Sequence, residues 1–210
     1  NVAVVEATMA GSLTDEWLAS SVGGKKKIVI TGKMNNADLK KLAAFTNSNK
    51  TTDLCILATG VTSIEDGAFL HSSDLENISL PQGLKSIGVA AFNICESLSS
   101  ISLPQGVTSI GVRTFAGCNQ LESVILSGYD PNVSPDAPML PSVDSSAFKD
   151  AAPLTNLFLR DVSETLFKAN QATYIAWAQN AGITWKNIYC GLKEGIDWND
   201  PYETDEPGNY

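Results

Sequence analysis

The segment Val61–Tyr129 reads VTSIEDGAFLHSSDLENISLPQG, LKSIGVAAFNICESLSSISLPQG and VTSIGVRTFAGCNQLESVILSGY, which are three adjacent copies of one 23-residue unit. A fixed period of this size is typical of one supersecondary unit stacked on itself, and not of a globule with a single closed core. Six apolar positions recur in every copy: Val61/Leu84/Val107, Ile64/Ile87/Ile110, Phe69/Phe92/Phe115, Leu75/Leu98/Leu121, Ile78/Ile101/Val124 and Leu80/Leu103/Leu126.

The last three of these positions have the L-x-x-L-x-L spacing of a leucine-rich repeat, in which a short strand turns alternate side chains inward. We therefore predict an α/β repeat solenoid, a right-handed leucine-rich-repeat stack with 23-residue coils. The wider pattern S-I-G-x-x-A/T-F-x-x-C-x-x-L-x-S-I-x-L-P-Q-G resembles the BspA-type leucine-rich repeat of bacterial surface proteins. This resemblance implies a secreted or outer cell-surface protein that adheres to host or matrix proteins.

Beyond the clean copies, residues 130–139 (DPNVSPDAPM) interrupt the period with three prolines and are predicted to form a loop. The period then resumes, so that residues 61–162 hold four coils with one ten-residue insertion. The fourth copy, 140–162, has its apolar residues at the same offsets: Leu140, Val143, Phe148, Leu154, Leu157 and Leu159.

Residues 1–60 are predicted to form an N-terminal segment and cap that shields the open end of the stack. We expect a short helix over 14–20, a strand over 27–31, a helix from Asn35 or Asn36 to Phe45, and a strand over 53–57. Two registers fit the second strand. Either Cys55 points inward, or its neighbours Leu54 and Ile56 do; the second register buries more apolar surface and is preferred.

Residues 163–192 are predicted to form a helical C-terminal cap that begins at Ser163, faces Trp177 inward and stops at Gly182. The segment Trp185–Ile188 resembles the closing segment of the family. The remaining residues, 193–210, form an acidic tail with Trp198, Tyr202 and Tyr210, and their composition is typical of disorder.

The net charge of -9 argues against DNA or RNA as a partner, because such partners require a basic surface. No apolar run is long enough to span a bilayer. The stretch Val2–Val5 is too short for a signal peptide and lacks a basic leader, so an exported protein would be present here in a mature or trimmed form.

The four cysteines do not form a disulfide framework in a chain of this length. Cys95 and Cys118 share a repeat position with Ser72 and Ala151, which predicts a small buried slot and free thiols. Neighbouring coils lie about 5 Å apart, so distance alone does not forbid a bridge between the two. Cysteine spacing and a single histidine, His71, do not suit a zinc site.

Catalytic motifs are missing from this sequence. His71 falls on a variable turn and is predicted to be solvated, with a catalytic base as the remote second interpretation. No G-x-S-x-G elbow is present. The acidic run that starts at Asp197 could bind calcium weakly, but Pro201 replaces a ligand position and a solvated tail is favoured. We predict no enzyme, no cofactor and no metal site.

Outward-facing strand positions are the better candidates for binding. The first two coils present serine and asparagine there, whereas Ile125, Phe158 and Arg160 form an apolar pair with an arginine at its rim, near Asn156, Tyr129 and the 130–139 loop. These five residues are the candidate contact patch. Equally, the loop or the tail could simply cover Ile125 and Phe158.

The sequence thus predicts a non-enzymatic binding module with a protein ligand, and it leaves the oligomeric state open. One alternative is a glycan-binding surface protein, in which Tyr129, Phe158, Trp198 and Tyr202 would supply stacking platforms. The other is a structural spacer or self-assembly module without a ligand site on its repeats.

Overall fold

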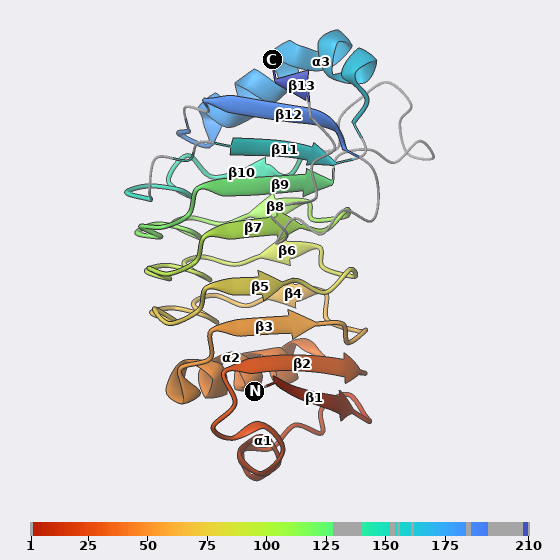
Figure 1. The fold of residues 1–210 in the computed structure, drawn as a ribbon, viewed down its shortest axis with the longest axis vertical. Helices are drawn as coiled ribbons and strands as arrows, with labels where there is room; N and C mark the ends of the chain where they lie inside the picture. The colour runs from red at the N-terminus through yellow and green to blue at the C-terminus, as the bar shows by residue number, and fades with distance from the viewer. Residues whose placement is uncertain are drawn as a thin grey trace.

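Parallel strands from successive coils pair into one long sheet that runs the length of the molecule (Figure 1). The computed structural model describes residues 2–127, 140–151, 154, 156–160, 162–183, 186–192 and 208–209. Its nine strands, in spatial order, are β1 (Val2–Ala7), β2 (Lys27–Gly32), β3 (Asp53–Ile56), β5 (Asn77–Ser79), β7 (Ser100–Leu103), β9 (Ser123–Ser127), β11 (Asn156–Arg160), β12 (Asn187–Leu192) and β13 (Gly208–Asn209). Only β13 pairs antiparallel. The predicted α/β solenoid is confirmed.

A second, narrow sheet lies where each coil begins, and the sequence analysis did not predict it. Its members are β4 (Ser63–Ile64), β6 (Ser86–Ile87), β8 (Ser109–Ile110) and β10 (Ser142–Val143), paired in parallel. Each isoleucine of β4, β6 and β8 is buried, so the repeated Ser-Ile pair places one apolar side chain inside every coil. The interior of the stack therefore lies between two ladders of backbone hydrogen bonds.

The N-terminal cap follows a strand–helix pattern. Helix α1 (Asp15–Val22) begins after Thr14, whose hydroxyl accepts a 3.1 Å hydrogen bond from the Trp17 N–H. Helix α2 (Asn36–Asn49) begins after Asn35, and it extends beyond the predicted end at Phe45. Both predicted helices and the strand over 27–31 are confirmed. Strand β1, parallel to β2, was not predicted.

Asp38 ties the loop between β1 and α1 to the start of α2. The side chain is buried, and its carboxylate accepts hydrogen bonds from the N–H groups of Leu13 at 3.1 Å and Asn35 at 3.0 Å. The Asn35 side chain in turn accepts a bond from the Asp38 N–H at 2.9 Å, which completes a capping box. A buried carboxylate is thus satisfied by backbone donors that helix α2 and the loop would otherwise leave unpaired.

The register of β3 follows the preferred prediction. Leu54 and Ile56 are buried, Cys55 faces the other side, and Leu54 aligns with Ile78 of β5. Asp53 and Asn77 are therefore neighbours on the solvent face, where the Asn77 amide donates a 3.0 Å hydrogen bond to the Asp53 carboxylate. The two residues are 24 positions apart in the sequence. The first coil is one residue longer than the 23-residue period.

The four phenylalanines of the repeat form one column through the core. The ring centroids of Phe69 and Phe92 are 5.0 Å apart, those of Phe92 and Phe115 5.4 Å, and those of Phe115 and Phe148 5.0 Å, with nearly parallel ring planes. These spacings match the distance between neighbouring strands. The rings therefore stack because the backbone hydrogen bonds of each coil already set that interval.

Strand β11 pairs with β9, and its residue Asn156 aligns with Ser123, 33 residues earlier. This offset is one period plus ten residues. Residues 128–139, which include the predicted loop and Tyr129, lie outside the described residues. The inward side chains of this coil, Phe148, Leu154, Leu157 and Leu159, are buried.

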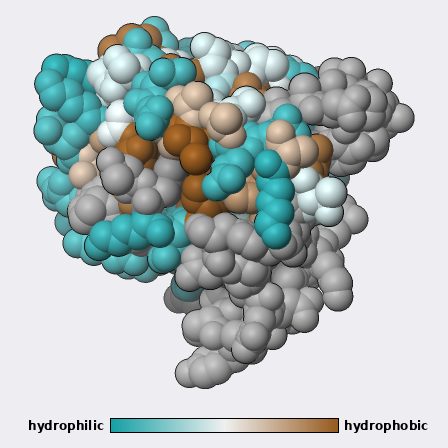
Figure 2. Space-filling model, turned by 90° about the horizontal axis from the view of Figure 1, so that it is seen from above, coloured by the Kyte–Doolittle hydropathy of each residue, from teal (hydrophilic) through white to brown (hydrophobic). Residues whose placement is uncertain are grey.

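Helix α3 (Glu164–Asn180) closes the C-terminal end, as predicted, with Ser163 as its N-cap. Phe167, Tyr174 and Trp177 are buried, and the Trp177 indole donates a 2.7 Å hydrogen bond to the Pro141 carbonyl. Seen from above, a small apolar area lies beside polar residues at this end (Figure 2). Trp185 and the tail residues 193–207 and 210 are outside the described residues, while Gly208–Asn209 form β13.

Cys95 and Cys118 are free, buried thiols, as predicted. Each sulfur donates a 3.1 Å hydrogen bond to a carbonyl of the preceding coil, Cys95 to Phe69 and Cys118 to Phe92. Ser72 occupies the same position one coil earlier and is also buried, yet its hydroxyl has no hydrogen-bond partner among the described residues. In this column the two thiols donate hydrogen bonds, whereas the Ser72 hydroxyl, in the coil next to the N-terminal cap, has no partner among the described residues.

We expect Ser72→Ala to raise the free energy of unfolding by about 1 kcal/mol, because it removes a buried polar group that has no partner. Cys95→Ala serves as the contrast. It should lower stability by about 1–2 kcal/mol, since it removes a packed, hydrogen-bonded sulfur. Urea titrations of both variants measure the difference. A loss above about 1 kcal/mol for Ser72→Ala would show that its hydroxyl is bonded.

Phe92→Ala opens a cavity in the middle of the phenylalanine column and should cost about 3–5 kcal/mol of unfolding free energy. Val112→Ala on an exposed turn is the control, with an expected change below about 0.5 kcal/mol. Equilibrium denaturation by circular dichroism provides both values. Equal losses for the two variants would contradict the continuous core.

Candidate functional site

The solvent face of the long sheet presents three columns of side chains, one residue per strand. The first column contains Val2, Lys27, Asp53, Asn77, Ser100, Ser123, Asn156 and Asn187. The second contains Val4, Val29, Cys55, Ser79, Ser102, Ile125, Phe158 and Tyr189. The third begins with Glu6, Thr31 and Leu57. The opposite face of the same strands is filled by the core, so these columns are the surface that the described part of the sheet offers to a partner.

The C-terminal end of this face carries the predicted contact patch. Phe158 is half-buried and its ring stacks on Tyr189 of β12, with centroids 4.8 Å apart. Asn156 is half-buried and accepts a 3.0 Å hydrogen bond from the Asn187 amide. Arg160 lies on the same strand and is also half-buried. The structure therefore brings Asn156, Phe158 and Arg160 together on β11.

Two predicted members of the patch differ from expectation or cannot be placed. Ile125 is only 5% exposed, so the exposed position predicted for it is wrong. The alternative prediction, that Ile125 is covered, therefore holds for this residue, whose register neighbour in β11 is the large side chain of Phe158. Tyr129 falls outside the described residues. Binding by the patch stays a prediction.

The N-terminal end of the face carries an apolar surface that the sequence analysis missed. Val2, Val4 and Leu57 are 53%, 69% and 61% exposed, and all three point to solvent from β1 or from the end of β3. Val29 and Cys55 lie half-buried between them. The alternation of side chains in VAVVEA could have predicted β1. No strand was predicted for this short segment, so its valines could not be assigned to the solvent face or to the core face of the sheet.

A shallow depression of about 430 Å³ crosses the same strands, and we call it the N-terminal trough. It runs between the first and second columns over β1, β2, β3 and β5. Its side chains include Val2, Lys27, Val29, Asp53, Cys55 and Asn77. The trough therefore combines an apolar floor with a polar wall, a lining that is common in ligand sites.

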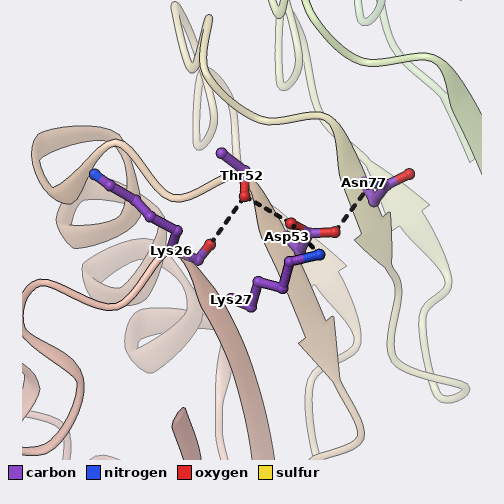
Figure 3. A network of polar contacts seen from close by, with 5 residues as sticks. All are labelled: Lys26, Lys27, Thr52, Asp53 and Asn77. Atoms are coloured by element: carbon purple, nitrogen blue, oxygen red, sulfur yellow. Dashed lines mark hydrogen bonds and ion pairs between the residues drawn. The ribbon is translucent and has the colours of Figure 1, made fainter. Parts of the chain in front are cut away.

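Hydrogen bonds fix the polar wall of the trough (Figure 3). The Asp53 carboxylate accepts bonds from the Thr52 hydroxyl at 2.6 Å and the Asn77 amide at 3.0 Å, and it pairs with the Lys27 ammonium at 3.4 Å. Partial burial raises the pKa of Asp53, but the bonds from Thr52, Asn77 and Lys27 outweigh it and hold the pKa below its usual value. Asp53 is thus anionic at neutral pH, and its stabilising contribution is lost only as the pH falls through this lowered pKa.

Other sequence features have a structural place. His71 is exposed on a turn in the left-handed conformation, with a φ of 60°, in agreement with the predicted variable turn. Over the described ranges, no group of three His, Cys, Asp or Glu side chains could hold a metal ion. No helix in that part of the chain is long and apolar enough to span a membrane.

Comparison with known protein families agrees with the repeat pattern. A family model described as BspA type leucine rich repeat region (6 copies) matches residues 41–169. The chain belongs to the BspA-type leucine-rich repeat family. The crystal structure of a T. pallidum leucine-rich repeat protein is 24% identical over 75% of this chain, with a TM-score of 0.45. Our chain spans 64% of the length of that protein. No curated protein matches.

Membership in the BspA-type family indicates a protein-binding repeat module. Proteins with this repeat are typically non-enzymatic scaffolds, found on the surface or secreted. The repeat signature occupies the inward positions of this stack, so residues that differ between coils lie on the turns and on the outward columns of the sheet. The N-terminal trough, and the Phe158–Tyr189 pair with the neighbouring Ile125 and Arg160, are places where those columns depart from serine and asparagine.

Cys55 should be the one cysteine of the native protein that reacts quickly with a maleimide. It is half-buried on the open face, whereas the other three cysteines are buried. Burial also raises the pKa of Cys95, and that of Cys118 to about 12, so both stay protonated at pH 8. Mass spectrometry after brief labelling should show one adduct, absent in Cys55→Ser. Several adducts at equal rates in the folded protein would contradict this arrangement.

Proposed function

We propose that this chain is a secreted or outer-surface module that binds a host or matrix protein through the solvent face of its long sheet. The observation that supports this most directly is the sheet itself. Eight parallel strands share one face on which side chains point to solvent, while the opposite face of the strands is closed by the core. The typical location and binding role of BspA-type proteins support the same conclusion.

The size and relief of this face suit a protein partner better than a small molecule. Eight parallel strands at a spacing of about 4.8 Å extend over roughly 34 Å, which is the scale of a standard interface. In the middle of the face, Ser79, Ser100 and Ser102 are small, so a partner can approach the strands closely. Toward the ends, valines on one side and the Phe158–Tyr189 pair on the other provide larger contacts.

A glycan is the second candidate partner, and the Phe158–Tyr189 pair is the observation in its favour. Half-buried aromatic rings on an open face can stack on the apolar side of a sugar. However, the two rings stack on each other at 4.8 Å, so part of each ring face is already occupied. The other aromatic residues suggested for this role, Tyr129, Trp198 and Tyr202, lie outside the described residues. A protein ligand is therefore preferred.

Ser102→Arg should abolish partner binding without unfolding the chain, because it places a long charged side chain in the middle of the open face. The control is Ser73→Arg, the same substitution at an exposed serine of a turn. Binding to a panel of immobilised matrix proteins should fall at least about tenfold for Ser102→Arg and stay unchanged for Ser73→Arg. Melting temperatures of both variants should match the parent.

The opposite pattern, with loss of binding in Ser73→Arg only, would place the contact on the turns and contradict the proposal. The glycan alternative is tested in parallel on a glycan array. Sugar binding that Phe158→Leu removes, together with no binding to any matrix protein, would favour the glycan and reject the protein ligand.

A further inference from the structure

The charge of the chain is divided unevenly along the stack. Residues 1–60 contain seven lysines and five acidic residues, whereas residues 61–210 contain seven basic and eighteen acidic residues. The N-terminal cap is thus weakly positive in a protein whose net charge is -9. The N-terminal trough lies on this cap, so an acidic partner would be attracted there and repelled by the rest of the molecule.

Within the trough, Lys27 is the cationic side chain and its position is fixed. The ion pair with Asp53 at 3.4 Å uses one of its three N–H donors, and its side chain remains 55% exposed. Asp53 is anionic and partly offsets the charge of Lys27, but its oxygens accept from Thr52, Asn77 and Lys27, so it offers little to a cationic ligand. An incoming carboxylate would be bound by the remaining N–H donors of the exposed Lys27 ammonium, and the net positive charge of residues 1–60 favours its approach.

The apolar part of the site lies one column away. Val29 lines the trough, and its register neighbour Val4, which is 69% exposed on β1, lies directly beside the trough. The trough crosses three strand intervals, or roughly 14 Å, which an extended peptide covers with four or five residues. Because side chains of an extended segment alternate in direction, acidic residues would face Lys27 while aliphatic residues face Val4 and Val29.

We propose that the N-terminal trough is a docking site for an extended segment of a partner protein in which acidic and aliphatic residues alternate. This assignment rests on the proposed function and specifies where on the sheet face the partner binds and what chemistry it presents. Lys27 provides the charged contact, Val4 and Val29 the apolar contact, and the positive cap directs the segment to this end.

The test uses the full chain and three short fluorescein-labelled peptides with alternating Glu-Val, Gln-Val or Lys-Val in their centre. Fluorescence polarisation should show saturable binding of the Glu-Val peptide, weakened by salt, with the Gln-Val peptide at least about tenfold weaker. Lys27→Gln and Val4→Ser should each lower the affinity about tenfold. The controls Lys149→Gln and Val112→Ser change exposed residues on distant turns and should have no effect.

Equal binding of all three peptides, or affinity that Lys27→Gln leaves unchanged, would overturn the assignment. Self-association in sedimentation that Lys27→Gln abolishes would also overturn it, because the occupant would then be a second copy of this chain. These results are separable from a failure of the proposed function. If matrix-protein binding is lost in Ser102→Arg but no Glu-Val peptide binds, the sheet face still functions and only the trough assignment fails.

Discussion

Parallel pairing between successive coils is the constraint on which the rest of the structure depends. One coil alone would expose its apolar side chains on both sides and leave its strand unpaired, so its burial cannot offset the entropy of ordering its backbone. Stacking removes both problems at once. The phenylalanine column shows the result, because ring centroids 5.0–5.4 Å apart follow the interval that the strand hydrogen bonds impose.

Because of the same constraint, inward positions determine stability and outward positions are free to determine what the sheet face binds. Inward positions are restricted to side chains that fill a fixed volume, including the small slot of Cys95 and Cys118. Outward positions have no such restriction, and each coil adds one residue to each column. Along this face the side chains change from valines and the Lys27–Asp53 pair, through serines, to the Phe158–Tyr189 pair. Different parts of the face therefore offer different side-chain chemistry to a partner.

Inward residues were predictable because each is repeated at a fixed offset, and Leu54 could be oriented because a one-residue slip would expose it. Outward residues were harder. The register neighbour of Ile125, Phe158, lies 33 residues later in the sequence, across an insertion, so the surroundings of Ile125 could not be read from its own repeat. The apolar end of the face was missed because it requires β1, whose six residues contain no repeat signature. The register of β2, β3 and β5, once known, is sufficient to place Lys27, Asp53 and Asn77 side by side in one column.

The central claim, that partners meet the open sheet face, is tested most directly by thiol protection in a bound complex. Native Cys55 reports on the face, and Ser73→Cys in a Cys55→Ser background reports on a turn. Maleimide labelling is followed with and without a saturating matrix-protein partner. We predict that the partner slows labelling of Cys55 at least about tenfold and leaves the turn thiol unaffected. Protection of the turn thiol alone would contradict the account.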